Sequence, residues 1–217
     1  MIRTVIFDLD GTLLNTLDDL AGSVNFALDR NGFPTRSLKE VRSFLGNGIG
    51  FLIRHAMPEE VSEEAFEKTL ADFRGHYMKH CLDKTRPYEG MMDVLAELKK
   101  EGYSMAIVSN KLQPAVEELN SRFFSAFVQV AIGESREVRR KPAPDSVFTA
   151  LRLLHAKAEE AVYVGDSEVD METAVNAGLP CISVLWGFRD ADFLKEHKAR
   201  LFAALPEELP AVIRSIE

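Results

Sequence analysis

Cysteine is scarce in this chain of 217 residues, which contains only Cys81 and Cys181. Neither belongs to a Cys-x-x-Cys pair, and two isolated thiols do not make a disulfide framework. We therefore expect each cysteine to be a small buried side chain. We also expect the protein to work in a reducing compartment, the cytoplasm.

Long apolar runs and basic clusters are missing as well. No stretch reaches the roughly 18 apolar residues of a membrane span, and the N-terminus has no signal-peptide pattern. The net charge is -8, and the densest basic cluster is only Arg139-Arg140-Lys141. An acidic surface argues against binding to nucleic acids and to anionic membranes. A small molecule is the expected partner, and the sequence leaves a monomer and a homodimer open.

The apolar residues, 46% of the chain, are enough for a sizeable core, and their arrangement indicates an α/β fold. Short segments rich in β-forming residues alternate with amphipathic helical segments. The expected strands are residues 4–7, 104–108, 128–132, 161–164 and 181–185. This alternation predicts βαβ units and a Rossmann-like, doubly wound parallel sheet.

One long block interrupts the alternation. Residues 15–83 contain no convincing strand, but four segments with apolar residues at helical spacing. These segments are residues 17–30, 38–45, 51–56 and 63–80. The block is too long for an ordinary connection between a strand and a helix. We expect an inserted α-helical domain of residues 15–83 within a core domain formed by residues 1–14 and 84–217.

Two carboxylates arrive together at the end of the first expected strand, in Asp8-Leu9-Asp10-Gly11-Thr12. Alternation along the strand places Asp8 and Asp10 on the same side, and Gly11 permits a sharp turn after them. Such close carboxylates repel unless a cation, a proton or a reacting group lies between them. Ligands bind at this end of the strands in open α/β sheets. The pair therefore predicts a metal site and a nucleophile.

Two simpler interpretations of this motif exist. A calcium-binding loop would need a Glu at its twelfth position, but Asp19 stands there, and the positions between are mostly apolar. An ordinary surface turn is compatible with the motif taken alone. This motif alone does not distinguish a surface turn from a reactive site, but residues elsewhere in the chain do.

Further polar residues follow the other expected strands. Ser109 and Asn110 follow the second strand, Lys141 lies in the loop after the third, and Asp166 and Asp170 follow the fourth. Singly, each is explained as a turn residue, a helix cap or a surface lysine. Together, at one edge of a parallel sheet, such groups suit phosphoryl transfer. A carboxylate attacks phosphorus, carboxylates hold Mg²⁺, and an ammonium and a hydroxyl stabilise the transferring group.

These motifs, in this order, resemble those of the haloacid dehalogenase superfamily. They are Asp8-Leu9-Asp10-Gly11-Thr12, Val108-Ser109-Asn110-Lys111, Lys141-Pro142, and Gly165-Asp166-Ser167 with Asp170. The resemblance spans nearly the whole chain. It implies that the helical insertion is a cap domain of the first class, and that hinges near Asn15 and Lys84 let the cap close over the site.

The resemblance also implies a role for each motif residue. Asp8 would be the nucleophile and a Mg²⁺ ligand. Asp10 would be general acid and then general base, with its backbone carbonyl on the metal. Lys141 would neutralise charge around Asp8 and the phosphate. An aspartate at the position of Asp10 is similar to phosphatases and mutases, since the dehalogenases lack it.

The other motif residues would bind the phosphoryl group and the metal. The resemblance implies that Ser109 and Asn110 contact the phosphoryl group, that Asp166 is a further Mg²⁺ ligand, and that Asp170 supports the metal site.

At about 4 Å and an effective dielectric near 20, each like-charged pair costs about 4 kcal/mol. Mg²⁺ and Lys141 would offset this repulsion, so we expect Mg²⁺ as the cofactor.

Within the superfamily, the chain is most similar to phosphoglycolate phosphatases, partly through Leu45-Gly46-Asn47-Gly48-Ile49 in the insertion. That resemblance implies a phosphomonoester hydrolase acting on 2-phosphoglycolate or a similar small metabolite. Gly46, Asn47, Gly48 and Arg54 would then contact a small anionic substrate, although a flexible turn between helices is equally compatible. Leu112 departs from the proline that this subgroup commonly has.

Other activities remain open at this point. Pyrophosphatases, nucleotidases and sugar-phosphate phosphatases share much of the pattern. A phosphomutase similar to β-phosphoglucomutase would use the same Asp8 and Asp10 chemistry but return the phosphoryl group to a sugar. A non-catalytic phosphate-binding module is disfavoured because every catalytic position is filled. A receiver domain with a phosphorylated aspartate is disfavoured by the long helical insertion.

Overall fold

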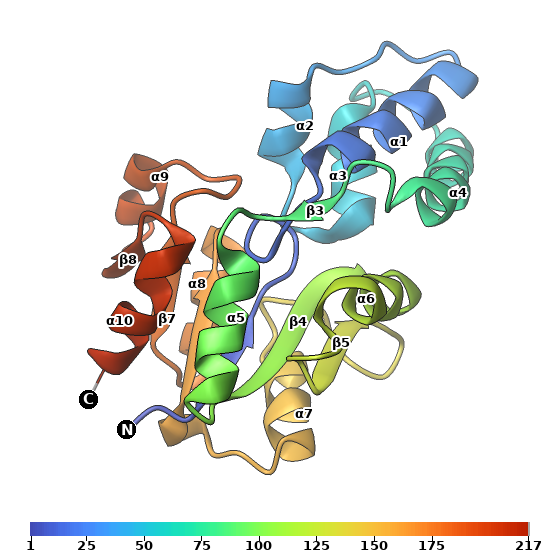
Figure 1. The fold of residues 1–217 in the computed structure, drawn as a ribbon. Coiled ribbons are helices and arrows are strands. Elements are labelled where there is room, and N and C mark those ends of the chain that lie inside the picture. The colour runs from blue at the N-terminus through green and yellow to red at the C-terminus, as the bar shows by residue number, and fades with distance from the viewer. Residues whose placement is uncertain (217) are drawn as a thin grey trace. The chain divides into compact units, whose positions relative to one another are not determined.

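The structure is a computed structural model that describes residues 1–216. It contains two compact units (Figure 1). One unit consists of Met1–Leu14 and the chain from Pro87 onward, and the other is Asn15–Arg86. None of the described helices is both long and apolar enough to cross a membrane.

The larger unit is built on a six-stranded sheet in the order β5-β4-β1-β6-β7-β8, in which every neighbouring pair is parallel. The strands are β1 (Thr4–Phe7), β4 (Ser104–Leu112), β5 (Val130–Glu134), β6 (Ala161–Gly165), β7 (Cys181–Val184) and β8 (Leu201–Ala203). The central strand β1 lies between β4 and β6, with Phe7 opposite Ile107 and Val164. The ends of β1, β4 and β6 therefore meet at one edge, where the motif residues follow.

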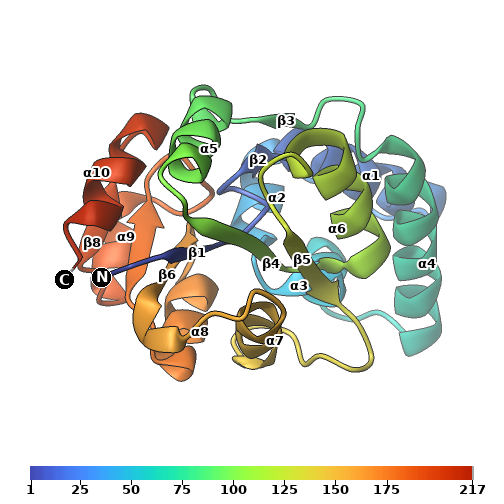
Figure 2. The same cartoon turned by 60° about the horizontal axis from the view of Figure 1, so that its bottom comes forward.

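Helices cover both faces of this sheet, so the predicted doubly wound α/β fold is confirmed. Figure 2 shows α5 (Met91–Lys100) and α10 (Leu209–Arg214) on one face, and α7 (Asp145–Leu153) and α8 (Glu168–Ala177) on the other. The remaining helical segments are α6 (Gln113–Leu119), α9 (Ala191–Glu196), a π-helical turn at Asn120–Phe124, and 3-10 turns at Ala158–Glu160 and Pro206–Glu208.

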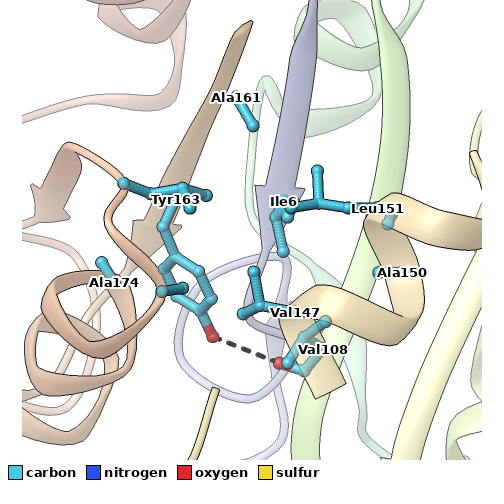
Figure 3. Close-up of a cluster of buried hydrophobic side chains, with 11 residues drawn as sticks. Ile6, Val108, Val147, Ala150, Leu151, Ala161, Tyr163 and Ala174 are labelled. Carbon is cyan, nitrogen blue, oxygen red and sulfur yellow. Dashed lines mark hydrogen bonds between the residues drawn. The ribbon is translucent and has the colours of Figure 1, made fainter. Parts of the chain in front are cut away.

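A buried apolar cluster joins α7 and α8 to the sheet (Figure 3). Ile6 of β1 and Val108 of β4 pack there with Val147 and Leu151 of α7. The buried residues of the cluster include one polar side-chain atom, the hydroxyl of Tyr163, which donates a hydrogen bond of 3.4 Å to the Val108 carbonyl. Tyr163 is fully buried, and its hydroxyl connects this core to the polar residues at the sheet edge.

The structure differs from the sequence predictions at several strands. Strand β8 was not predicted, because a three-residue segment is too short to show a period of two. Strand β5 begins two residues later than expected. Strand β4 continues to Leu112 with a register shift after Val108, so Ser109 and Asn110 lie in its irregular end instead of following it.

The smaller unit is entirely helical apart from its ends. Its helices are α1 (Leu17–Arg30), α2 (Leu38–Phe44), α3 (Gly48–Ala56) and α4 (Glu63–His80). The chain enters and leaves through two short strands that pair with each other, β2 (Leu14–Asn15) and β3 (Arg86–Pro87). The buried carboxylate of Asp19 accepts hydrogen bonds from the backbone N–H groups of Lys84 and Thr85, at 2.8–3.0 Å. These bonds tie the start of α1 to the exit of the unit.

Candidate active site

Asp8 lies directly after the central strand. Its backbone N–H donates to the Val164 carbonyl at 2.9 Å, so pairing with β6 fixes the backbone at this position. The residue is only 7% exposed. Its Oδ1 lies 2.8 Å from the Nζ of Lys141. A buried carboxylate therefore meets a buried ammonium at the edge of the sheet.

Lys141 reaches this position because Asn110 holds its backbone. The Lys141 N–H donates to the Asn110 Oδ1 at 2.7 Å, and the Asn110 Nδ2 donates to the Lys141 carbonyl at 3.1 Å. Both bonds are buried. The Asn110 side chain thus joins the end of β4 to the loop before α7. Its predicted contact with a phosphoryl group stays a prediction.

The Lys141 ammonium has three partners. Besides Asp8, its Nζ lies 2.7 Å from the Asp170 Oδ1 and 3.1 Å from the Tyr163 hydroxyl. The Tyr163 hydroxyl also lies 3.1 Å from the Asp170 Oδ1. A charge removed from water is tolerated only when it is well paired. These contacts supply that pairing and fix the direction of the lysine side chain.

Replacing Tyr163 with phenylalanine tests this contact, because it removes one hydroxyl and preserves the ring in the core. We expect kcat to fall by about 3- to 10-fold as Lys141 loses one of its partners, with a loss of about 1 kcal/mol of stability. Rapid kinetics and chemical denaturation measure the two effects. Tyr103→Phe, in the loop before β4, is the control, and an equal fall in kcat there would contradict the assignment.

Asp170 is fully engaged with protein groups. Ser167 is the N-cap of α8, and its side chain and that of Asp170 form a reciprocal capping box. The Asp170 Oδ2 accepts from the Ser167 N–H at 3.0 Å, the Ser167 Oγ at 2.6 Å and the Asp166 N–H at 3.2 Å. With its Oδ1 on Lys141 and Tyr163, Asp170 is suited to orienting its neighbours.

Asp166 is held by the loop after β7. Its Oδ2 accepts a hydrogen bond of 2.6 Å from the Phe188 N–H. Two glycines approach it closely: a Cβ atom at Gly187 would lie 2.2 Å from the Asp166 Cβ, and one at Gly11 would lie 2.4 Å from its Oδ2. The indole N–H of Trp186, in the same loop, donates to the Thr12 carbonyl at 3.0 Å. The segments after β1 and β7 therefore enclose this carboxylate, which itself follows β6.

Gly187→Ala is expected to disturb Asp166 directly, since the added methyl overlaps its side chain. We expect a loss of about 1–3 kcal/mol of stability and an affinity for a divalent cation reduced at least about 10-fold. Calorimetric titration and thermal melting measure these changes. Gly22→Ala in α1 is the matched control, because nothing lies within 4 Å of its added methyl. We expect that variant to be unchanged or slightly more stable.

Burial and the repulsion between neighbouring carboxylates shift the pKa values of the groups in this cluster. Burial, and then the neighbouring charge of Asp170, raises the pKa of Asp8 from 3.8 to about 7. The same two causes hold the pKa of Asp166 well above its usual range. Burial opposes the charge of Lys141, but the carboxylates of Asp170 and Asp8 together hold its pKa well above 10.5. Lys141 therefore stays protonated. Its single positive charge does not balance the negative charge of the neighbouring carboxylates.

The donor set fits a divalent cation. Carboxylate oxygens of Asp8, Asp166 and Asp170 all lie within 4.8 Å of one another, and this is the one such acidic cluster among residues 1–216. Mg²⁺ is typically bound through one or two carboxylates with water and phosphate oxygens completing the sphere. Since Asp170 is engaged elsewhere, Asp8 and Asp166 are the side chains suited to hold the ion.

Asp10 points to a different lysine. Both of its carboxylate oxygens contact the Nζ of Lys111, at 2.8 and 3.0 Å. The Lys111 N–H in turn donates to the Ser109 Oγ at 3.2 Å. Asp8 and Asp10 therefore each have an ammonium partner from a different segment. The structure brings Asp8, Asp10, Ser109, Asn110, Lys141, Asp166 and Asp170 together in one unit.

The candidate residues of the helical unit have other surroundings. Gly46 and Gly48 adopt positive φ angles of 108° and 80° on either side of Asn47, the N-cap of α3. The Arg54 guanidinium contacts both oxygens of Glu63, at 3.0 and 2.8 Å, and stacks 3.5 Å above the Phe66 ring. Arg54 is thus anchored within its own unit, and a substrate contact for it stays a prediction.

Sequence reasoning assigned no role to several residues that the structure places at the site. Lys111 belongs to the motif Val108-Ser109-Asn110-Lys111, but nothing in the pattern linked it to Asp10. Tyr163 looked like any core residue of a buried strand. The Phe188 N–H is a backbone group in a loop, and the sequence carries no signal for its contact with Asp166.

Comparison with known proteins places this site in a family. The sequence profile of the haloacid dehalogenase-like hydrolases matches residues 5–184. The chain belongs to this family. All seven motif residues lie within the matched region, so the predicted resemblance is confirmed.

Curated relatives and a solved structure are also similar to this chain. The chain is 32% identical over 197 residues to a phosphoglycolate phosphatase of Pseudomonas syringae pv. tomato, covering 86% of this chain and 70% of the relative. It is 34% identical over 194 residues to that of Mesorhizobium japonicum, covering 86% and 84%. A crystal structure from Lactobacillus delbrueckii subsp. bulgaricus, assigned by prediction as a phosphoglycolate phosphatase, superposes with a TM-score of 0.92 at 32% identity, covering 97% and 98%.

Proposed function

We propose that this family member is a Mg²⁺-dependent phosphatase that hydrolyses small phosphomonoesters through an aspartyl-phosphate on Asp8. One observation carries the proposal. The buried Asp8 carboxylate lies 2.8 Å from the Lys141 ammonium, in a cluster that also contains Asp166. A nucleophile, a fixed positive charge and a metal-binding carboxylate are the groups that phosphoryl transfer requires.

In the first step, an Asp8 oxygen attacks phosphorus and the bond from phosphorus to the ester oxygen breaks. Asp10, in its protonated form, donates a proton to the departing alcohol and becomes a carboxylate, and Lys141 stabilises charge on the transferring group. Because Asp8 and Lys141 are almost fully buried, little solvent screens their charges. The product of this step is an acyl phosphate on Asp8.

In the second step, water attacks the phosphorus of this acyl phosphate. Asp10, now ionised, accepts a proton from the water, the bond from phosphorus to Asp8 breaks, and inorganic phosphate leaves. Lys141 again compensates the negative charge that returns to Asp8. Asp170, Tyr163 and Asn110 keep Lys141 in place during both steps.

Asp8, Asp166 and the backbone carbonyl of Asp10 would hold Mg²⁺. When bound, the ion neutralises carboxylate and phosphate charge and orients the phosphoryl group. Asp170 would act indirectly, through its bonds to Lys141 and to the Asp166 N–H. The raised pKa values of Asp8 and Asp166 support the need for this extra positive charge.

We propose 2-phosphoglycolate as the substrate, acted on in the cytoplasm, with the helical unit as a cap. Relatives named phosphoglycolate phosphatase at 32% and 34% identity support this substrate. The glycines flanking Asn47 would let backbone N–H groups at the start of α3 approach a small anion. The short paired strands β2 and β3 would act as hinges for cap closure.

A substrate panel tests the proposal. Phosphate release is measured with Mg²⁺ and with excess chelator on 2-phosphoglycolate, pyrophosphate, nucleoside monophosphates and sugar phosphates. We expect a strong preference for 2-phosphoglycolate that disappears with chelator. Preference for another ester would change the substrate assignment but not the proposed phosphatase chemistry. Isomerisation of a sugar phosphate without net phosphate release would instead identify a phosphomutase, and full activity in chelator would contradict the metal dependence.

A further inference from the structure

A second lysine is buried at the site without a part in the mechanism above. The side chain of Lys111 is 4% exposed, while that of its ion-pair partner Asp10 is 19% exposed. The ammonium therefore lies on the inner side of the carboxylate. The carboxylate is the more exposed of the two partners.

The backbone that carries Lys111 is held tightly. Leu112 pairs with Glu134 of β5 after the register shift in β4. The two strands approach so closely at Gly133 that an added Cβ would lie 2.7 Å from the Lys111 carbonyl oxygen. On its other side, the Lys111 N–H bonds the Ser109 Oγ. The lysine side chain thus extends from a fixed point toward Asp10.

We propose that Lys111 is a positioning residue that orients the Asp10 carboxylate for proton transfer. This inference rests on the proposed acid–base role of Asp10. A carboxylate on a short side chain rotates freely unless something holds it. Contact of one ammonium with both oxygens, at 2.8 and 3.0 Å, fixes the plane of the carboxylate. General acid–base catalysis depends steeply on such placement.

The two lysines therefore have separate tasks. Lys141 compensates charge at the nucleophile Asp8, whereas Lys111 holds the proton carrier Asp10 in place. Lys141 contacts Asp8, Asp170 and Tyr163, whereas the Lys111 ammonium contacts Asp10. Removing Lys111 should affect only those reactions in which a proton must be transferred.

Leaving-group chemistry provides the test. An alkyl phosphate such as 2-phosphoglycolate needs a proton on the departing oxygen, but p-nitrophenolate leaves without one. With enzyme in excess over substrate, release of the alcohol or phenol reports the first step alone. We expect Lys111→Met to slow this step about 10- to 100-fold for the alkyl ester and less than about 3-fold for p-nitrophenyl phosphate.

Three comparisons make the test specific. Lys111→Arg, which can still contact both oxygens, should restore most of the alkyl rate. Asp10→Asn should show the same leaving-group discrimination, and adding Lys111→Met to it should cause little further loss. Lys68→Met, on α4 in the helical unit, is a control for loss of a lysine charge. Thermal melting of every variant identifies any that fails to fold.

Several results would overturn the inference. Equal slowing of both substrates by Lys111→Met would point to a structural role, and no slowing of either would show that Asp10 needs no partner. If adding Lys111→Met to Asp10→Asn lowered the rate by the full factor again, the two residues would act independently. By contrast, wild-type enzyme that transfers no phosphoryl group from either ester contradicts the proposed function itself, and the inference with it.

Discussion

Replacing Asp8 with asparagine is expected to abolish phosphate release, with kcat lowered by at least about 10³-fold for every substrate. The amide cannot attack phosphorus, and no other carboxylate occupies its place. Asp166 is bonded to the Phe188 N–H, and Asp170 to Lys141 and Ser167. Steady-state assays with the substrate panel measure the loss. Asp192→Asn, at a position whose side chain is 92% exposed, is the control and should keep full activity.

The same substitution has a second expected result, on stability without metal. The pKa of Asp8 is 3.8 in the unfolded chain and about 7 in the folded protein. Between these values the folded state binds more protons, so the free energy of unfolding falls as pH rises from about 4 to 7. Asparagine removes this penalty. At pH 8 in chelator, the variant should therefore melt no lower than wild type, which separates lost chemistry from lost folding.

Mg²⁺ is expected to stabilise the protein much more at pH 8 than at pH 5.5. Binding requires ionised carboxylates, and the pKa of Asp8 is about 7 while that of Asp166 is also raised. Each pH unit below about 7 should then weaken apparent Mg²⁺ affinity about 10-fold for each proton that must leave. Thermal melting with and without Mg²⁺ across this pH range measures the effect.

Asp8→Asn is again the informative control. It removes one of the two carboxylates that we propose as ligands of the ion, so stabilisation by Mg²⁺ should be smaller and should depend less on pH. An identical rise in melting temperature at pH 5.5 and 8 in wild type would contradict the assignment of Asp8 and Asp166 as ligands. So would an unchanged response in the variant.

The polar motifs predicted which residues gather at this edge because a parallel sheet brings the ends of its strands together. Asp8 follows β1 and Asp166 follows β6, and these strands are neighbours although they are far apart in sequence. The alternation of strands and helices indicated such an edge. The strand order itself is a tertiary property, and no local pattern specifies which two ends become adjacent.

The contacts that hold the reactive groups were less accessible to sequence reasoning. Lys111 contacts Asp10 from the part of β4 that follows the register shift after Val108 and continues beside β5. Tyr163 reaches Lys141 from a core position, where the sequence shows only a buried strand. Loop contacts, such as the Phe188 N–H on Asp166, depend on backbone conformation after β7. Each of these arises from packing between distant segments.

The most direct test of the central claim is detection of the phosphorylated Asp8 side chain. Enzyme turning over 2-phosphoglycolate with Mg²⁺ is quenched with borohydride, which reduces an acyl phosphate to an alcohol, and peptides are then sequenced by mass spectrometry. The account predicts reduction at residue 8 that requires both substrate and Mg²⁺. Reduction at another aspartate, or rapid turnover with none at residue 8, would contradict it.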